Sequence, residues 1–154
     1  MKKLFLLVFS IFFVACFNTT TTTQILDSND QIEFYNTSDK YPFSEATVVN
    51  NVIYLSGKIG TDPSTGELVE GGIAPETKQI MDNIKNTLTK MGSSMDNIFK
   101  CTCMLADIKD WPLMSQEYKK FFNPQKLPAR SAFAGSGLAL GAKLEIECMA
   151  IKKN

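Results

Sequence analysis

The sequence contains no histidine, and only one of its 16 basic residues is an arginine, Arg130. Without histidine the chain cannot build a Ser-His-Asp or Cys-His nucleophile system, an imidazole zinc site or a histidine general base. Acid–base chemistry must therefore come from carboxylates, Lys, Tyr, Cys or a bound water. A planar, two-pronged contact to a carboxylate or phosphate must come from Arg130, because a lysine offers only a point charge.

The chain also lacks an excess of charge of either sign. Its 16 acidic residues balance the 16 basic ones, the pI is near 6.3, and the lysines form no stripe along the sequence. A nucleic-acid-binding protein typically carries a basic patch, so the charge pattern argues against that class. The length of 154 residues fits one domain.

The N-terminus has the pattern of a signal peptide over residues 1–15. Two lysines precede a run of 12 residues, 4–15, that is apolar apart from one serine. A membrane-spanning helix needs about 20 such residues, so the run is too short to span and fits a signal peptide. It ends in a small residue followed by Cys16, which resembles a bacterial lipobox, although Phe13 stands where Leu is usual. An ordinary secretory signal, cut nearby, is the alternative interpretation.

The lipobox resemblance implies that Cys16 is lipidated and begins the mature protein. Residues 16–31 then form a polar, threonine-rich tether, and residues 32–154 form the folded domain. This organisation predicts a protein of the bacterial cell envelope, facing the periplasm or the surface, that contacts the membrane only through its lipid anchor.

Three further cysteines, Cys101, Cys103 and Cys148, lie in apolar runs. The Cys-x-Cys pair has no second pair and no histidine with which to complete a metal site, and its spacing is poor for a disulfide within one strand. We interpret these cysteines as buried small apolar side chains. A Cys103–Cys148 disulfide in an oxidising compartment stays open as an alternative.

Hydrophobic periodicity predicts one α+β unit with the element order β-β-α-β-α-β-β. The predicted strands are 46–50, 51–60, 97–106, 130–135 and 143–152; the predicted helices are 75–91 and a second one that begins after Asp110 and ends at Asn123-Pro124. The Asn50-Asn51 pair predicts a tight turn between the first two strands, because Asn tolerates positive φ.

Apolar side chains recur on one side of each helix. They are Ile80, Ile84, Leu88 and Met91 in the first helix, and Leu113, Met114, Tyr118, Phe121 and Phe122 in the second. Trp111 and Tyr118 are interpreted as core or subunit contacts. Two helices cover only one face of a sheet. The other face carries Glu145 and Glu147 and needs water or a partner subunit.

Several motifs resemble the reactive intermediate deaminase (RidA/YjgF-like) family. They are Leu127-Pro128-Ala129-Arg130-Ser131 followed by Lys143-Leu144-Glu145-Ile146-Glu147, together with Tyr54-Leu55-Ser56-Gly57, Asp62-Pro63-x-Thr65-Gly66-Glu67 and Tyr118-x-x-Phe121-Phe122. The resemblance covers residues 42–152. It implies a chorismate-mutase-like α+β fold, with a six-stranded mixed sheet and two helices on one face. It also implies a homotrimer with sites in the clefts between subunits.

The family resemblance implies hydrolysis of 2-imino acids, which are tautomers of enamines, to 2-keto acids and ammonia, with no metal or cofactor. Arg130 would bind the substrate carboxylate and Glu145 would hold the water. Ser56 would line the site, and backbone groups near Gly57 and Ala132 would contact the substrate.

Three of the implied site positions depart from the best-studied branch of the family. Phe43 replaces a tyrosine, Ala132 replaces a reactive cysteine, and Ser115 stands where Asn is frequent. These departures affect the choice of substrate more than the fold.

Other roles remain open for the same residues. Arg130 could form a structural salt bridge to Glu145 or Glu147. The domain could also be a non-catalytic trimer that binds a small carboxylate, or an endoribonuclease or translation inhibitor. Neutral charge and export argue against the last of these.

Overall fold

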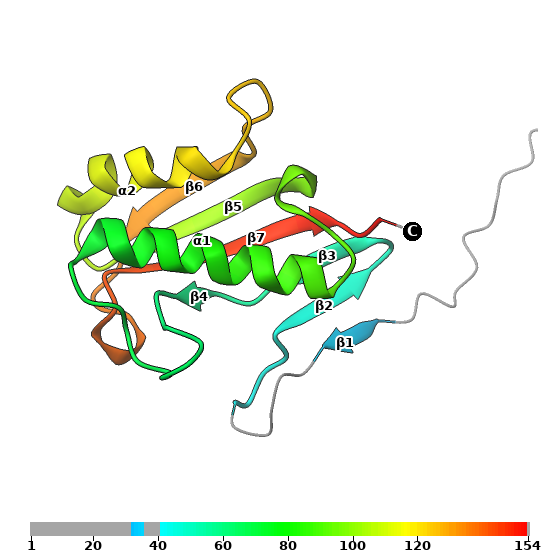
Figure 1. Cartoon of the computed structure of the whole chain (residues 1–154), viewed down its shortest axis with the longest axis horizontal. Coiled ribbons are helices and arrows are strands. Elements are labelled where there is room, and N and C mark those ends of the chain that lie inside the picture. The colour runs from blue at the N-terminus through cyan, green and yellow to red at the C-terminus, as the bar shows by residue number, and fades with distance from the viewer. Residues whose placement is uncertain (1–31, 36–40, 154) are drawn as a thin grey trace, which may run out of the picture.

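The computed structural model describes residues 32–35 and 41–153 (Figure 1). The strands are β1 (Glu33–Tyr35), β2 (Ala46–Val49), β3 (Val52–Leu55), β4 (Lys58–Ile59), β5 (Ile98–Leu105), β6 (Ala129–Ala134) and β7 (Leu144–Ile151), and the α-helices are α1 (Ile73–Lys90) and α2 (Trp111–Tyr118). The predicted signal peptide, Cys16 and the tether lie outside the described residues.

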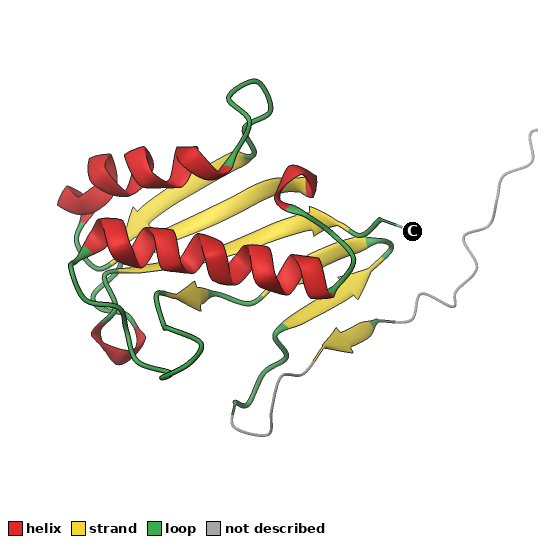
Figure 2. Cartoon of the chain, in the orientation of Figure 1, coloured by secondary structure: helices red, strands yellow, loops and turns green. Residues whose placement is uncertain are grey.

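The seven strands form one mixed sheet in the order β1-β2-β3-β7-β5-β6, and β4 also pairs with β7. All pairs are antiparallel except β5 with β6. Both helices lie on the same face of the sheet (Figure 2). The α+β fold with two helices on one face is therefore confirmed.

The sheet has seven strands, which is one more than the resemblance implies and two more than the five ranges that periodicity predicts. Residues 51–60 were predicted as one strand, but pairing is interrupted at Ser56-Gly57, which separates β3 from β4. The short strand β1 adds a further partner at the β2 edge. The predicted turn is confirmed, since Asn50 and Asn51 have φ of 49° and 62°, which suits a two-residue hairpin.

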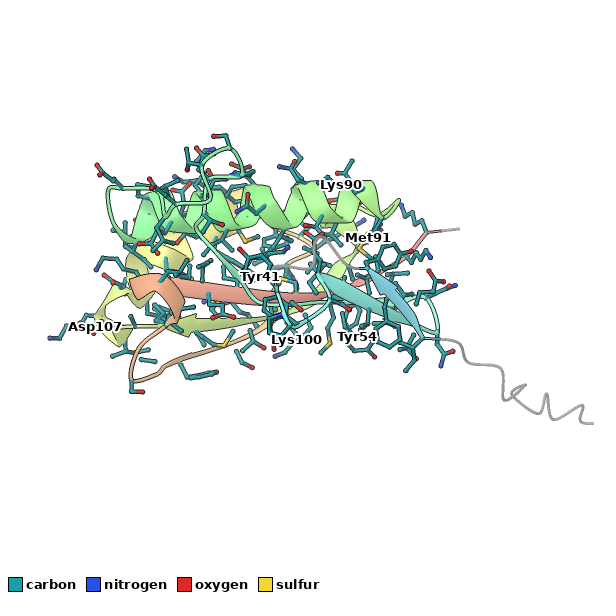
Figure 3. The ribbon with its side chains drawn as sticks, turned by 90° about the horizontal axis from the view of Figure 1, so that it is seen from below. Tyr41, Tyr54, Lys90, Met91, Lys100 and Asp107 are labelled. Atoms are coloured by element: carbon teal, nitrogen blue, oxygen red, sulfur yellow. A yellow bond between two sulfur atoms is a disulfide. The ribbon has the colours of Figure 1, made fainter. Side chains whose placement is uncertain are left out.

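The hydrophobic core lies between the helices and the sheet. Ile80, Ile84 and Leu88 of α1 are fully buried, which confirms the apolar stripe. Strand β7 alternates as predicted, with Leu144, Ile146, Cys148 and Ala150 buried and the residues between them partly exposed. The face away from the helices is open, and Figure 3 shows Tyr54 and Lys100 on it.

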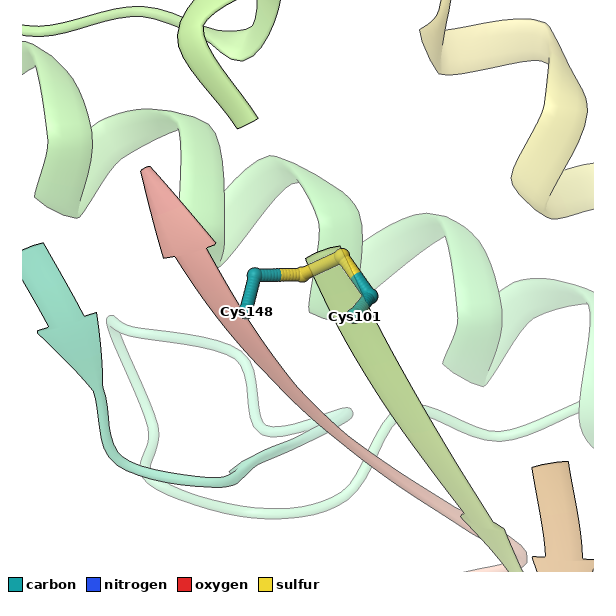
Figure 4. The surroundings of a disulfide bond; sticks show 2 residues. All are labelled: Cys101 and Cys148. Atoms are coloured by element: carbon teal, nitrogen blue, oxygen red, sulfur yellow. A yellow bond between two sulfur atoms is a disulfide. The ribbon is translucent and has the colours of Figure 1, made fainter. Parts of the chain in front are cut away.

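Cys101 and Cys148 form a disulfide (Figure 4). They lie directly opposite each other in the β5–β7 register, whereas Cys103 faces Ile146. Cys103 is a free, buried thiol. The alternative of a Cys103–Cys148 pair is therefore wrong. The interpretation as an unpaired buried side chain is confirmed for Cys103 and wrong for Cys101 and Cys148. The register between β5 and β7 determines which cysteine pairs with Cys148, and the spacing of cysteines in the sequence does not reveal this register.

The helix boundaries differ from the predicted ones. Helix α1 begins at Ile73, two residues before Pro75. Helix α2 ends at Tyr118, and a short 3₁₀ turn follows it over Lys119–Phe121. Leu113 was predicted to be buried but is 48% exposed, because Trp111, Met114, Ser115 and Tyr118 instead form the side of α2 that faces the sheet. No helix within residues 32–35 and 41–153 has the length and apolar character needed to cross a bilayer.

Candidate active site

Arg130 lies on β6, the last strand at one edge of the sheet. It pairs with Cys101 in the β5–β6 register, and Cys101 belongs to the buried core beneath the helices. Side chains of paired residues share a face of the sheet. The half-buried Arg130 side chain therefore lies on the helix side, next to α2.

Four residues of α2 surround the guanidinium of Arg130. Its Nη2 donates a hydrogen bond to Ser115 Oγ at 3.0 Å, and its Nη1 contacts Met114 Sδ at 3.8 Å. Its Cζ lies 4.9 Å from the ring centre of Tyr118 and 5.5 Å from that of Trp111. These residues occupy positions i, i+3, i+4 and i+7, which form one side of a helix.

No carboxylate lies within ion-pair distance of Arg130 among the residues that the structure describes. The alternative of a structural salt bridge to Glu145 or Glu147 is therefore wrong within this chain. A half-buried guanidinium held by neutral groups keeps N–H donors for an anion, and a carboxylate matches their fork geometry.

Glu145 lies on the opposite, open face, where it pairs with Met104 of β5 and Ile59 of β4. Its carboxylate occupies the space that a side chain at Gly57 would fill. A Cβ built on Gly57 would overlap Oε1 of Glu145. The break between β3 and β4 thus brings a glycine against the carboxylate and leaves it room.

The Glu145 carboxylate forms no hydrogen bond or ion pair with any residue in 32–35 or 41–153. Its neighbour on the same face, Glu147, faces Thr102. A partly exposed carboxylate without a protein donor is free to accept from a water, as a water-positioning group must.

Two of the other expected site residues surround the start of β2. Ser56 donates a hydrogen bond from Oγ to the Ser44 carbonyl oxygen at 2.7 Å, and its backbone N–H donates to the Glu45 carbonyl oxygen at 3.1 Å. Phe43 is 55% exposed and stacks on Tyr41 with ring centres 5.5 Å apart. The Ser56 hydroxyl therefore fixes the segment that carries Phe43.

The chain places the expected residues in three groups. Arg130, Ser115 and Ala132 lie on the helix side near β6, Glu145 with Gly57 lies on the open face, and Ser56 and Phe43 lie at the start of β2. Arg130 and Glu145 are two strands apart and three register positions apart, which corresponds to about 10 Å across the sheet and about 10 Å along it. Because they also point to opposite faces, they cannot bind one small molecule within one chain.

Sequence reasoning missed two supporting features. Trp111 was assigned to core or subunit contact. Its helical spacing to Ser115 and Tyr118 could have indicated that the three side chains lie on one side of the helix. Glu76, only 5% exposed, accepts a hydrogen bond from the Lys143 N–H at 2.8 Å and so fixes the chain two residues before Glu145. A glutamate on the apolar stripe of α1, four residues before Ile80, was the available signal.

The two other ionisable groups near Arg130 are poor acid–base groups. Burial raises the pKa of the Cys103 thiol to about 11, and the nearby charge of Arg130 offsets only part of this. Burial also raises the pKa of Tyr118 far above its ordinary value. Both groups are therefore neutral near pH 7, and the only buried side-chain polar atom without a partner among the described residues is the Tyr118 hydroxyl.

The open face is unusually apolar for a surface in contact with water. Phe34, Tyr54 and Phe133 are 64%, 40% and 51% exposed, and their register positions place them on the same face as Glu145. An exposed group of large apolar side chains marks an interaction surface.

The α+β domain thus presents a half-buried arginine without a carboxylate partner among the described residues and, on the other face, a partly exposed glutamate. Residues 37–152 match the family model described as Endoribonuclease L-PSP, and the chain belongs to that family.

Curated relatives of the chain are named as deaminases. The chain is 42% identical over 111 residues to the human 2-iminobutanoate/2-iminopropanoate deaminase, a match that covers 72% of this chain and 80% of the human protein. It is 38% identical over 109 residues to Reactive Intermediate Deaminase A, chloroplastic, of Arabidopsis thaliana, covering 71% of this chain and 58% of the relative.

Solved structures of relatives share the fold. The Rid family protein YyfA from Yersinia pestis superposes with a TM-score of 0.74 at 34% identity and covers 79% of this chain and 99% of its own. RidA from the Antarctic bacterium Psychrobacter superposes with a TM-score of 0.72 at 28% identity, with coverages of 77% and 98%.

Proposed function

We propose that the chain is an imine deaminase that hydrolyses 2-imino acids such as 2-iminobutanoate and 2-iminopropanoate to 2-keto acids and ammonia. The observation on which the proposal rests is the half-buried guanidinium of Arg130. A hydroxyl, a thioether and two aromatic rings surround it, and no carboxylate of the described residues forms an ion pair with it. The named deaminase relatives at about 40% identity support this reaction.

In the proposed mechanism Arg130 binds the substrate α-carboxylate through two parallel N–H donors. Glu145 accepts a hydrogen bond from a water and directs its oxygen to the C=N carbon. As the C–O bond forms, Glu145 takes the proton that the water loses and passes it to the imine nitrogen. In the resulting carbinolamine the hydroxyl proton then moves to the amino nitrogen, the C–N bond breaks, ammonia leaves and the keto group remains.

This mechanism needs two copies of the chain. Because Arg130 and Glu145 lie on opposite faces of one sheet, we infer that the β6 edge of one subunit meets the open face of the next. The apolar side chains of that face, Phe34, Tyr54 and Phe133, support such a contact. A homotrimer with three equivalent inter-subunit sites satisfies this arrangement, because a head-to-tail interface closes into a ring.

The roles of the remaining site residues follow from their positions. Gly57 gives the Glu145 carboxylate its space, and Ser115 holds the guanidinium. Ser56 fixes the segment of Phe43, whose ring adds an apolar wall without a hydroxyl donor. Ala132 follows Arg130 on the same face and offers its backbone. A small, unbranched apolar side chain on the imino acid suits these groups.

We also propose that the protein is exported and anchored through Cys16, with residues 1–15 as signal peptide and 16–31 as tether before the domain. The disulfide between Cys101 and Cys148 supports export, because disulfides persist in oxidising compartments. Replacement of Cys16 by Ser tests the anchor, and the variant should lose membrane association. Membrane association that survives Cys16→Ser contradicts the lipid anchor.

The activity is tested by adding the purified domain to threonine dehydratase and threonine and following 2-ketobutyrate release. We expect acceleration by the wild type and none by Arg130→Ala, while Lys126→Ala, an exposed loop lysine and matched loss of one charge, accelerates fully. No acceleration by the wild type, with measurable binding of 2-ketobutyrate, identifies the domain as a non-catalytic carboxylate-binding protein instead.

A further inference from the structure

The guanidinium of Arg130 lies against two aromatic rings supplied by the two ends of one short helix. Trp111 is the first residue of α2 and Tyr118 is the last. Their ring centres lie 5.5 Å and 4.9 Å from Arg130 Cζ, which is within cation–π range. The helix therefore contacts the guanidinium at both of its ends.

The polar contacts of Arg130 leave most of its donors unused. Of the five N–H groups of a guanidinium, one is given to Ser115 Oγ and another faces Met114 Sδ. Aromatic faces attract the cation without accepting its in-plane hydrogen bonds. They thus restrict the orientation of the group and leave its edge open to a carboxylate.

The two rings differ in burial and in their polar ends. Tyr118 is 4% exposed and its hydroxyl is without a partner among the described residues. The ring face therefore accounts for its contact with Arg130, and the hydroxyl adds nothing. Trp111 is 43% exposed, so it borders the solvent side of the guanidinium, from which a ligand arrives.

We propose that Trp111 and Tyr118 are positioning residues that hold the Arg130 guanidinium in the orientation required to bind the substrate carboxylate. The proposal rests on the proposed deaminase function. It extends that function from one arginine to a preformed carboxylate-binding element built on α2. Preorganisation of this kind lowers the entropic cost of binding, so its loss appears in affinity.

Trp111 is the only tryptophan of the chain, and this makes it an internal probe of the site. We expect 2-ketobutyrate, which carries the same α-carboxylate as the imino acid, to change the Trp111 fluorescence of the wild type on titration. The change should be absent in Arg130→Ala.

The positioning role is tested by comparing Trp111→Leu with Trp111→Phe in steady-state kinetics and in calorimetric binding of 2-ketobutyrate. We expect Trp111→Leu to raise KM and Kd about tenfold, with kcat nearly unchanged and an unchanged melting temperature. Trp111→Phe, which keeps a ring, should restore most of the affinity. Leu113→Ala, an exposed apolar truncation on the same helix, should behave as wild type.

Tyr118 gives an independent second comparison. Tyr118→Phe keeps the ring and should leave KM unchanged, whereas Tyr118→Leu should raise it. A Trp111→Leu variant with wild-type KM and Kd overturns the positioning role while the wild-type activity still upholds the deaminase. A wild type that neither turns over the imine nor binds 2-ketobutyrate overturns the deaminase function, and the positioning role with it.

Discussion

The two faces of the sheet differ in how many of their polar and reactive groups have a bonding partner within the chain. On the helix side, the core packs around the Cys101–Cys148 disulfide, and Arg130 is held by four residues of α2. On the open face, the Glu145 carboxylate has no hydrogen-bond or ion-pair partner among the described residues, and large apolar side chains are exposed. The helix side thus carries stability, and the open face is the one against which we propose that a second subunit packs.

Arg130 is the exception to this division, because the group that we propose to bind the substrate carboxylate lies on the stabilised side. It lies on the edge strand β6, where its guanidinium is half-buried against α2 at the border of the core. A substitution on the helix side is therefore expected to change stability unless it touches Arg130, and a substitution on the open face is expected to change activity.

The largest expected effect comes from Glu145→Gln. Loss of the carboxylate that orients the water should lower kcat by about 10³-fold, with a melting temperature within error of the wild type. Glu147→Gln is the matched control, because Glu147 lies on the same strand and face, and it should keep full activity. Equal losses in both variants would refute a specific role for Glu145.

The disulfide should dominate stability on the helix side. It closes a loop with a sequence separation of 47 residues, for which chain entropy predicts a contribution of about 4 kcal/mol. We expect urea unfolding of the wild type to shift to lower concentration in reductant. Cys148→Ala should abolish this sensitivity to reductant, and Cys103→Ala should retain it. Sensitivity lost in Cys103→Ala instead would mean that the bond forms with Cys103.

Gly57→Ala should separate activity from stability on the open face. The added methyl overlaps the Glu145 carboxylate, so the side chain must move away from its water-binding position. We expect kcat to fall by about ten- to a hundredfold with a small change in melting temperature. Gly135→Ala is the control, since its added Cβ would lie 3.9 Å from the nearest atom. A fully active Gly57→Ala enzyme would show that the Glu145 position is not critical.

The smallest expected effect concerns Glu45, beside α1. Burial alone would raise the pKa of Glu45, but hydrogen bonds from Lys58 and Thr87 outweigh it and lower the pKa below 4.5. The ionised Glu45 carboxylate therefore stabilises the folded state above pH 4.5. This stabilisation is lost as the pH falls through the lowered pKa of the folded state.

Glu45→Gln should accordingly lower the unfolding free energy by about 1 kcal/mol or less at pH 7, and the difference should vanish in acid. Chemical denaturation across pH checks this, with the exposed Glu70→Gln as control. A difference that persists unchanged below the pKa would exclude a charge effect at Glu45.

Those parts of the fold that depend on a single local sequence pattern were predictable from the sequence. The alternation of β7 and the stripe of α1 each specify a face, and the Asn50-Asn51 turn follows from backbone preference. The disulfide partner was not predictable, because it depends on the register between β5 and β7. The close approach of Gly57 to the Glu145 carboxylate was also missed, since the two residues are 88 positions apart in the chain.

The candidate site was predictable only in its residue types. Composition singled out Arg130, and the motif resemblance singled out Glu145. Neither indicated that one chain places the two on opposite faces, because this follows from strand order and register. The contacts of Trp111 with Arg130 likewise depend on how α2 packs against the edge strand.

The central claim is that one site takes Arg130 from one subunit and Glu145 from another. It is tested most directly by coexpressing Arg130→Ala and Glu145→Gln chains and measuring the deaminase activity of the mixed oligomers. Each variant alone should be inactive, and random mixing should restore about a quarter of the wild-type activity, because a quarter of the interfaces combine an intact arginine with an intact glutamate. Mixed oligomers that form but remain inactive would contradict the account.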